Sequence, residues 1–509
     1  MGCDKRQRRA ASGGLIPAMT LEIAHYLDDP EDVVRFLRAL PSHVRGEELS
    51  ALFELLVRGD HHSALWPVLH LDDLDGVCMA TLTRALPAFH TIYLFEGAKW
   101  ALCRNTMLPP TTHVYAWLDD AYRVSDNVCN WARNVVALSI ETPEFLKDPT
   151  LLGRALSACT NLRALTLQWQ NVDQMLLDQT LAVVVSTRPE LASLHLKAEN
   201  TPLLEDATSL VRWLRLPNAT TFKLTRLDLV GPAAATLATA LLASPTLTKI
   251  KLEHAPCLAR LLLDPALPPL PRQLHKLTLR YRGLSASVPA IAAKVASSRL
   301  TNLALSAFVP CNFMVIVAAL PHVHAMAKVK LTGADLVAFP ILPQLRRLAL
   351  HKCVLSKAAV IDLATLLTSS TRLEALDLSE SLLPDAHARH LLLAVPRWCS
   401  QRGPFRLLRL CHTALSDESA AVLAIALATA RNTSAVWIDV SGNVLSAASC
   451  RGLLTALSAT TQMTLMLYNA GPSIEDLVTH AQTHGVGSVR ALTFTSPPPE
   501  ANPWTTLNL

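Results

Sequence analysis

One short motif recurs along most of this chain. The pattern L-x-x-L-x-L occurs fourteen times between Val135 and Phe494, and the fourth positions of its copies are about 27 residues apart on average. Its clearest copies are LRALTL at 162–167, LASLHL at 191–196, LHKLTL at 274–279, LRRLAL at 345–350 and LEALDL at 373–378. A period of roughly 20 to 29 residues accommodates one strand and one helix. We therefore predict an array of strand-and-helix repeats.

Apolar residues recur at helical spacing between the predicted strands. The predicted helices cover 176–186, 233–242, 288–296, 358–367, 386–395, 418–428 and 447–457. Ser356 and Ser416 precede two of them and are suited to cap a helix N-terminus. The step from Val329 to Leu348 is only 19 residues and contains two prolines, so we expect an irregular repeat without a full helix there.

In this pattern the chain resembles the ribonuclease-inhibitor-like class of leucine-rich-repeat proteins, over residues 131–509. The resemblance implies an α/β horseshoe, in which a parallel sheet lines the inside and helices pack on the outside. Two weaker copies, at Trp66–Leu71 and Phe89–Leu94, precede this region. Residues 61–130 are therefore either degenerate repeats or a helical cap.

Residues 15–60 are predicted to form a helical segment of another kind. Two apolar stretches flank an acidic break, where Asp29 is the expected N-cap and Pro30 occupies the favoured first helical position. Residues 15–41 resemble the first half of an F-box, which implies binding to the adaptor of an SCF ubiquitin ligase. On that resemblance the adaptor-binding residues are Leu15, Pro17, Leu21, Ile23, Tyr26, Leu27, Pro30, Val33 and Phe36. The alternative is a plain helical cap that shields the end of the repeats.

Residues 1–14 are predicted to be a disordered basic tail. Gly2 and Cys3 allow acylation, and the basic run at 5–9 allows nuclear import, but short basic tails are usually only solvated. The chain has neither a signal-peptide core nor an apolar run of roughly 18 residues, the length that would span a membrane. We therefore expect a cytoplasmic or nuclear protein, or one found in both places.

Catalytic signatures are missing from the sequence. There is no G-x-x-x-x-G-K-[ST] or G-x-G-x-x-G motif, and 17 glycines in 509 residues leave little material for phosphate-binding loops. His480 and His484 have the spacing of a metal-binding pair beside Glu475, but no third ligand has a characteristic spacing. We predict no catalytic residue, cofactor or metal, and hence no enzyme.

The motif also predicts which side chains face a partner. Side chains alternate faces along a strand, so the third, fifth and seventh positions of each copy face the concave surface when the leucines point inward. In the third to ninth copies these positions carry nine Lys or Arg residues and two acids, although the whole chain has a net charge of only +5. The predicted partner-binding residues are Lys197, Arg226, Lys249, Lys251, Lys276, Arg280, Lys328, Lys330 and Arg347, with Trp437 and Tyr468 as apolar anchors.

Such a basic surface favours an acidic peptide, a phosphorylated segment or a polyanion. Nucleic acid is the weaker alternative, since the strip lacks interleaved aromatic residues for base stacking. Another alternative is that the lysines only keep an exposed sheet soluble.

The two regions together predict a non-enzymatic protein-interaction module. Its predicted role is that of an F-box-like substrate-recognition subunit of an SCF-type ubiquitin ligase, with the target on the concave face. The competing prediction is a ligase-independent scaffold or inhibitor.

Overall fold

The computed structural model describes residues 15–58, 62–74, 77–95, 100–118, 130–141, 149–170, 174–200, 202–403, 405–432, 434–460, 462–468 and 474–486. The basic tail at 1–14, with Gly2 and Cys3, and the last motif copy around Leu492 lie outside these ranges. The chain divides into two compact units, unit 1 at 1–240 and unit 2 at 241–509. None of the helices described is long and apolar enough to cross a membrane.

Unit 1 opens with three helices, α2 (Leu15–His25), α3 (Pro30–Ala39) and α4 (Ser42–Val57). The predicted cap of α3 is confirmed, because the Asp29 side chain accepts a hydrogen bond of 2.8 Å from the amide of Glu31 and Pro30 is the first helical residue. α4 packs against both α2 and α3. Sequence analysis had not resolved this third helix as a separate element.

A parallel sheet follows in unit 1. Its strands, in spatial order, are β1 (Leu69–His70), β2 (Thr91–Leu94), β3 (His113–Leu118), β4 (Val135–Ile140), β5 (Ala164–Trp169), β6 (Ser193–Ala198) and β8 (Thr221–Thr225). The sheet thus includes strands that precede Val135, at the two weaker motif copies and at β3.

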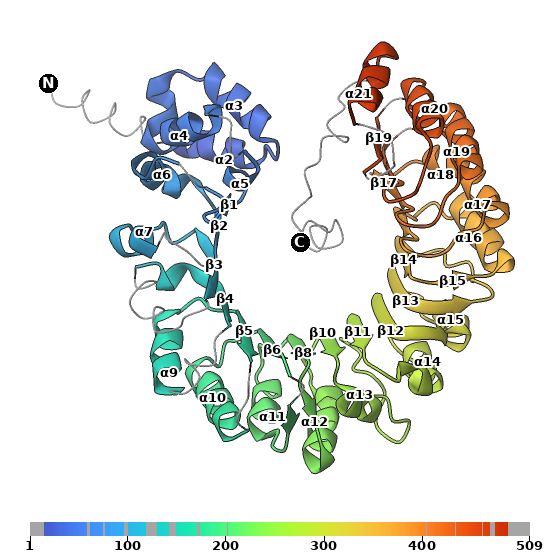
Figure 1. The fold of residues 1–509 in the computed structure, drawn as a ribbon. Helices are drawn as coiled ribbons and strands as arrows, with labels where there is room; N and C mark the ends of the chain where they lie inside the picture. The colour runs from blue at the N-terminus through green and yellow to red at the C-terminus, as the bar shows by residue number, and fades with distance from the viewer. Residues whose placement is uncertain are drawn as a thin grey trace, which may run out of the picture. The chain divides into compact units, whose positions relative to one another are not determined.

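The helices of unit 1 lie along one side of this sheet (Figure 1). They are α5 (His62–Leu65), α6 (Met79–Ala85), α7 (Trp100–Asn105), α9 (Pro149–Ala158), α10 (Gln174–Thr187), α11 (Thr208–Leu214) and α12 (Gly231–Ala243), with short 3-10 turns η1 (Leu86–Ala88) and η2 (Ala132–Asn134). α12 contains the boundary between the two units.

The predicted register is wrong in one copy. The copy LTRLDL at 224–229 places Leu227 at the fourth position of the motif, whereas the structure pairs Phe222 of β8 with Leu194 of β6. The correction makes the spacing regular, because Phe222 lies 28 residues after Leu194 and 28 before Ile250. Leu229 belongs instead to β9 (Asp228–Leu229), which pairs with β7 (Leu203–Leu204) in a separate two-stranded sheet. Two overlapping segments fit the motif here, one with Phe222 and one with Leu227 at the fourth position. The second has the better sequence match, but the first forms the strand.

Unit 2 contains the longer run of repeats. Its strands are β10 (Lys249–Glu253), β11 (Lys276–Arg280), β12 (Asn302–Asn312), β13 (Lys328–Leu336), β14 (Arg347–His351), β15 (Val354–Leu355), β16 (Ala375–Asp377), β17 (Phe405–Arg409), β18 (Ala435–Asp439) and β19 (Met463–Met466). The predicted register is confirmed from β10 to β19, since the fourth positions align across the sheet as Ile250, Leu277, Leu303, Val329, Leu348, Leu376, Leu408, Ile438 and Leu465. All nine side chains are buried, and burying one such aliphatic side chain stabilises the fold by roughly 1.5 to 3 kcal/mol.

The helices of unit 2 cover one face of its sheet (Figure 1). They are α13 (Pro256–Leu262), α14 (Val288–Ala296), α15 (Met314–Ala319), α16 (Lys357–Ser369), α17 (Asp385–Leu392), α18 (Val395–Cys399), α19 (Asp417–Thr429), α20 (Ala447–Ser458) and α21 (Ile474–Thr483), with 3-10 turns η4 (Leu284–Ser287) and η5 (Leu320–His322). Ser356 and Ser416 cap α16 and α19 through their side chains, as predicted. No helix lies between β13 and β14, which confirms the irregular repeat expected from the short step.

Polar side chains bridge successive repeats just after the strands. Ser381 accepts a hydrogen bond of 2.9 Å from the amide of Cys353 and donates one of 2.7 Å to the carbonyl of Leu350. Asn443 accepts from the amide of Thr413 at 3.0 Å. These buried bonds satisfy backbone groups that the turn leaves without strand partners. Each unit is therefore an α/β leucine-rich-repeat solenoid, and in unit 1 a helical segment precedes the repeats.

Candidate partner-binding surface

The described helices of unit 2 lie on one side of the sheet (Figure 1), and we call the opposite side of the sheet the open face. Three rows of side chains run across it from β10 to β14, because the strands pair in register. The first row is Lys249, Lys276, Asn302, Lys328 and Arg347; the second is Lys251, Thr278, Ala304, Lys330 and Ala349; the third is Glu253, Arg280, Ser306, Thr332 and His351. Seven of the predicted partner-binding cations thus lie on β10, β11, β13 and β14, and β12 between them carries none in these rows.

Two predicted cations belong to unit 1. Lys197 lies on β6, where it pairs in register with Thr225. The strand position predicted for Arg226 is wrong: this residue follows β8, is exposed and has a φ of 53°. Lys223 takes its place on the strand, in register with His195.

Acidic neighbours neutralise part of the positive charge on unit 2. The ammonium group of Lys251 lies 2.9 Å from the carboxylate of Glu253. Arg347 is only 9% exposed, and its guanidinium lies 4.0 Å from the carboxylate of Glu374. The most basic part of the open face is therefore smaller than the sequence indicated.

Four lysines retain their charge without such compensation. Within the ranges that the structure describes, Lys249, Lys276, Lys328 and Lys330 have no carboxylate within 4.0 Å of their ammonium groups. Burial lowers the pKa of Lys276, and the nearby charges of Lys249 and Lys251 lower it further. A partner's negative charge would relieve this repulsion.

The same two causes act on the lysines of β13. Burial and then Arg347 and Lys276 lower the pKa of Lys328, although Glu374 opposes part of this effect. Burial also lowers the pKa of Lys330, with a smaller contribution from Arg280 and an opposing one from Asp377.

A hollow of about 120 Å³ lies among these lysines. Asn302 and Ala304 of β12 line it together with Lys276, Lys328, Lys330 and Arg347. The hollow exists because β12 carries short side chains where the strands on either side carry lysines. Asn302 and Ala304 are not among the residues predicted from charge, and their only signal in the sequence is a small side chain at the third and fifth positions of a copy.

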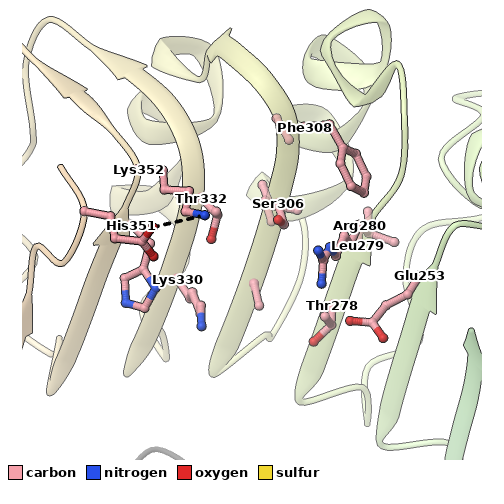
Figure 2. A pocket seen from close by; sticks show the side chains of 14 residues that line it. Glu253, Thr278, Leu279, Arg280, Ser306, Phe308, Lys330, Thr332, His351 and Lys352 are labelled. Carbon is pink, nitrogen blue, oxygen red and sulfur yellow. Dashed lines mark ion pairs between the residues drawn. The ribbon is translucent and has the colours of Figure 1, made fainter. Parts of the chain in front are cut away.

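A wider groove of about 430 Å³ adjoins the hollow and shares Ala304 and Lys330 with it. Figure 2 shows Phe308 over the far end of this groove, with Arg280 beneath it. The Phe308 side chain is 46% exposed, and its ring centroid lies 5.3 Å from the guanidinium carbon of Arg280. The groove thus combines an exposed aromatic wall with cationic sides, a pairing that the motif register did not reveal.

The open face changes character beyond β14. Asp377 is fully buried, with the imidazole of His351 at 3.0 Å and the guanidinium of Arg409 at 3.5 Å. Burial alone would raise the pKa of Asp377, but the contact with His351 and the hydrogen bonds from Ser379 outweigh it and hold this pKa well below its usual range. This cluster neutralises its own charge and is suited to a structural role.

The two predicted apolar anchors are exposed but separate. Trp437 lies on β18 and makes an edge contact with Phe405 at 5.9 Å between ring centroids. Tyr468 follows β19, four residues beyond Thr464, the register partner of Trp437. Four residues of extended chain span about 13 Å, so the two rings would contact different parts of a partner.

The N-terminal helical segment exposes a stripe of three apolar side chains. Met19 and Ile23 of α2 are 62% and 48% exposed, and Tyr26, directly after this helix, is 85% exposed. Among the predicted adaptor-binding residues, Leu21, Leu27, Pro30 and Phe36 are half-buried, while the side chains of Leu15 and Pro17 lie outside the described residues. Val33 is fully buried and belongs to the core of the segment, so it cannot contact an adaptor in this conformation.

The opposite side of α2 is fixed to the first repeats. The imidazole of His25 stacks on His90 at 3.6 Å between ring centroids and hydrogen-bonds to the carbonyl of Ala88 at 3.0 Å. The indole of Trp66 donates to the carbonyl of Leu27 at 2.7 Å. The exposed stripe is thus presented on a firmly packed helix.

The histidine pair near the C-terminus shows no metal-site geometry. The rings of His480 and His484 are tilted by 33° with 4.1 Å between their centroids, and the hydroxyl of Thr455 is 3.0 Å from His480 Nε2. Throughout the part of the chain that the structure describes, no three His, Cys, Asp or Glu side chains gather as metal ligands would.

No family model matches the chain, and no curated protein sequence matches it either. Among solved structures, one match is a TLR13–ssRNA13 complex, with 14% identity and a TM-score of 0.30 over 71% of this chain and 43% of that one. Another is the plant peptide hormone receptor RGFR1 in complex with RGF2, with 12% identity and a TM-score of 0.29 over 77% and 64%. This chain spans less than two thirds of either, and likenesses this weak carry no argument about what it binds.

Proposed function

We propose that the chain is a non-enzymatic protein-interaction module that captures an acidic partner on the open face of unit 2. The observation that carries the proposal is that, among the described residues, Lys249, Lys276, Lys328 and Lys330 have no carboxylate within 4.0 Å of their ammonium groups. Their mutual repulsion raises the free energy of the unbound surface, and a complementary negative partner lowers it. A surface with this charge steers acidic partners toward it and discriminates against basic ones.

The proposed wider role is substrate recognition within an SCF-type ubiquitin ligase. The support for it is the packed helical segment α2–α4, which resembles an F-box and exposes the stripe Met19, Ile23 and Tyr26. A helix with an apolar stripe is suited to a hydrophobic groove on an adaptor, because the stripe buries its area there. In this role α2 docks on the adaptor and unit 2 holds the target.

Partner capture is tested by reversing cations on the open face. Tagged Lys249→Glu/Arg280→Glu protein should lose most of the partners that the wild type retains, as identified by mass spectrometry. Arg299→Glu/Lys357→Glu is the matched control, since it makes the same charge change at exposed sites outside the three rows. Equal loss in both variants, or in neither, contradicts the proposal.

Adaptor binding is tested separately on α2. Ile23→Asp/Tyr26→Asp should abolish copurification with the SCF adaptor, while Met79→Asp, at an exposed apolar residue of α6, should leave it intact. If the wild type fails to copurify with the adaptor, the alternative of a ligase-independent scaffold or inhibitor is favoured. The charge-reversal experiment on the open face still tests partner capture in that case, because capture does not depend on the ligase.

A further inference from the structure

The hollow between β11 and β13 has the dimensions of a site for one small group. At about 120 Å³ it is well below the roughly 300 to 1,000 Å³ of pockets that enclose a whole small molecule. Its floor is the short β12 pair Asn302 and Ala304, and lysines stand on the strands at both sides. Neighbouring strands are about 4.8 Å apart, so Lys276 and Lys328 start roughly 10 Å apart and can both reach a group over Asn302.

The donors at this hollow suit a compact dianion better than a carboxylate. Lysine ammonium groups bind phosphate as point charges, whereas the planar fork of an arginine pairs with carboxylates and phosphates alike. The one arginine here, Arg347, is buried and faces Glu374. A phosphorylated side chain carries a charge of roughly −1.5 to −2 at pH 7. It therefore balances more of the positive charge of three lysines than a singly charged carboxylate does.

We propose that the hollow formed by Lys276, Lys328 and Lys330 over Asn302 is a binding site for a phosphate monoester, supplied by a phosphorylated side chain of a protein partner. This inference rests on the proposed function and makes its ligand class specific. The lysines donate to the phosphate oxygens, and the amide of Asn302 provides a further donor beneath them.

The adjoining groove specifies the residue next to the phosphate. It continues from Ala304 and Lys330 toward Phe308 and Arg280, along the direction of β12 (Figure 2). A peptide anchored by its phosphate would therefore place a neighbouring side chain against the Phe308 ring. The charge pattern argues against a long polyanion, because Lys251 with Glu253 and Arg347 with Glu374 are already neutralised at either side.

The experiment measures binding by isothermal titration at constant ionic strength to the full chain. Its probes are the blocked tripeptide Ala–phosphoserine–Ala, the same tripeptide with serine, and inorganic phosphate. The wild type should bind the phosphotripeptide more tightly than inorganic phosphate and should not bind the serine tripeptide. Equal binding of both tripeptides, or binding of inorganic phosphate alone, overturns the inference.

Variants assign the binding to the hollow. Lys276→Gln/Lys328→Gln should weaken phosphotripeptide binding roughly tenfold or more, because two charge-assisted contacts are lost. Lys276→Arg/Lys328→Arg keeps the charge and should stay within a few-fold of the wild type. The control Arg299→Gln/Lys357→Gln should have no effect, and a loss equal to that of the hollow variant contradicts the assignment.

The inference and the proposed function fail in different ways. If the wild type captures its partner after phosphatase treatment as well as before, and the open-face reversal still abolishes capture, the phosphate site is refuted and the interaction module stands. If the phosphotripeptide binds in the hollow but partner capture ignores the open-face reversal, the site stands and the proposed function is refuted.

Discussion

The guanidinium carbon of Arg280 lies 5.3 Å from the centroid of the Phe308 ring, across the boundary between β11 and β12. This contact exists because β12 departs from the register of β13 between Ser306 and Cys311, which leaves Phe308 exposed above its neighbour strand. The departure turns an otherwise flat sheet face into a groove with an aromatic wall. At this place on the open face a cation and an exposed aromatic ring are combined.

Phe308→Ala is expected to weaken binding of a partner that enters this groove by roughly 5- to 30-fold, because an aromatic anchor is worth about 1 to 2 kcal/mol. The free energy of unfolding should change little, since the ring is half-exposed. Val309→Ala, at the exposed neighbouring residue, is the control and should leave affinity unchanged. Titration of the captured partner against both variants measures the difference, and equal affinities would show that the ring is not part of the site.

Asn443→Ala is expected to destabilise the C-terminal repeats by about 3 kcal/mol, because it leaves several buried backbone groups unpaired. The Asn443 amide donates to the carbonyls of Leu410 and Val440, and its oxygen accepts from the amides of Thr413 and Leu415. The shift in the denaturant midpoint measures the effect.

The control for that variant is Asn302→Ala, at a half-buried asparagine on the open face. It should shift the midpoint by much less, since its side chain bridges no repeats. Similar shifts for the two variants would mean that the buried asparagine is no more important to the fold than a surface one.

Asp377→Asn is expected to reduce the free energy of unfolding by about 3 kcal/mol at pH 7, because it breaks a buried charge cluster. The pKa of this carboxyl is depressed below its ordinary value of 3.8 in the folded chain, so the unfolded chain takes up the proton first as the pH falls. The stabilisation is therefore complete well above pH 4 and is lost as the pH falls through the folded-state pKa.

Urea midpoints at pH 7, 5 and 3 test this pH dependence. The difference between the wild type and Asp377→Asn should be largest at pH 7 and should shrink at pH 3. Asp335→Asn, at an exposed carboxylate, should show no such trend. A difference that is independent of pH would exclude an ionised Asp377 as the source of the stability.

Phosphotripeptide binding is expected to weaken as the pH rises above neutrality. The weakening should begin at a lower pH than it would for lysines with ordinary pKa values. The pKa values of Lys276, Lys328 and Lys330 lie below the usual 10.5, so these side chains lose their charge earlier as the pH rises. A bound phosphate raises them again, and complex formation should therefore take up protons in that range. Titrations between pH 7 and 10 in buffers of different ionisation enthalpy measure the uptake.

Lys276→Arg/Lys328→Arg is the control for this effect, because guanidinium groups stay charged throughout the range. Its affinity should fall less steeply with pH than that of the wild type. Parallel profiles for the two proteins would show that the lysines of the hollow do not hold the phosphate.

The leucine pattern predicted the repeat fold because the burial of each motif position depends on the local geometry of its own strand. Period-2 alternation fixes which side of a strand points inward, and the burial of Leu277, Leu348 and Leu408 follows from it. The helix caps Ser356 and Ser416 were predictable for the same reason, since a cap is a contact within three residues. The fourth copy failed because two overlapping matches satisfy the same local rule, and only pairing with Leu194 distinguishes them.

The sequence by itself determined which lysines share a face, but the tertiary structure decided which of them keep an uncompensated charge. Lys276 and Lys328 are 52 residues apart in the chain, yet they flank one hollow because β12 lies between their strands. Arg347 was also predicted to bind the partner, but its guanidinium group faces the carboxylate of Glu374, which compensates its charge. The physical reason is that a charge responds to everything within a few ångströms, and in a solenoid those neighbours come from repeats that are far apart in sequence.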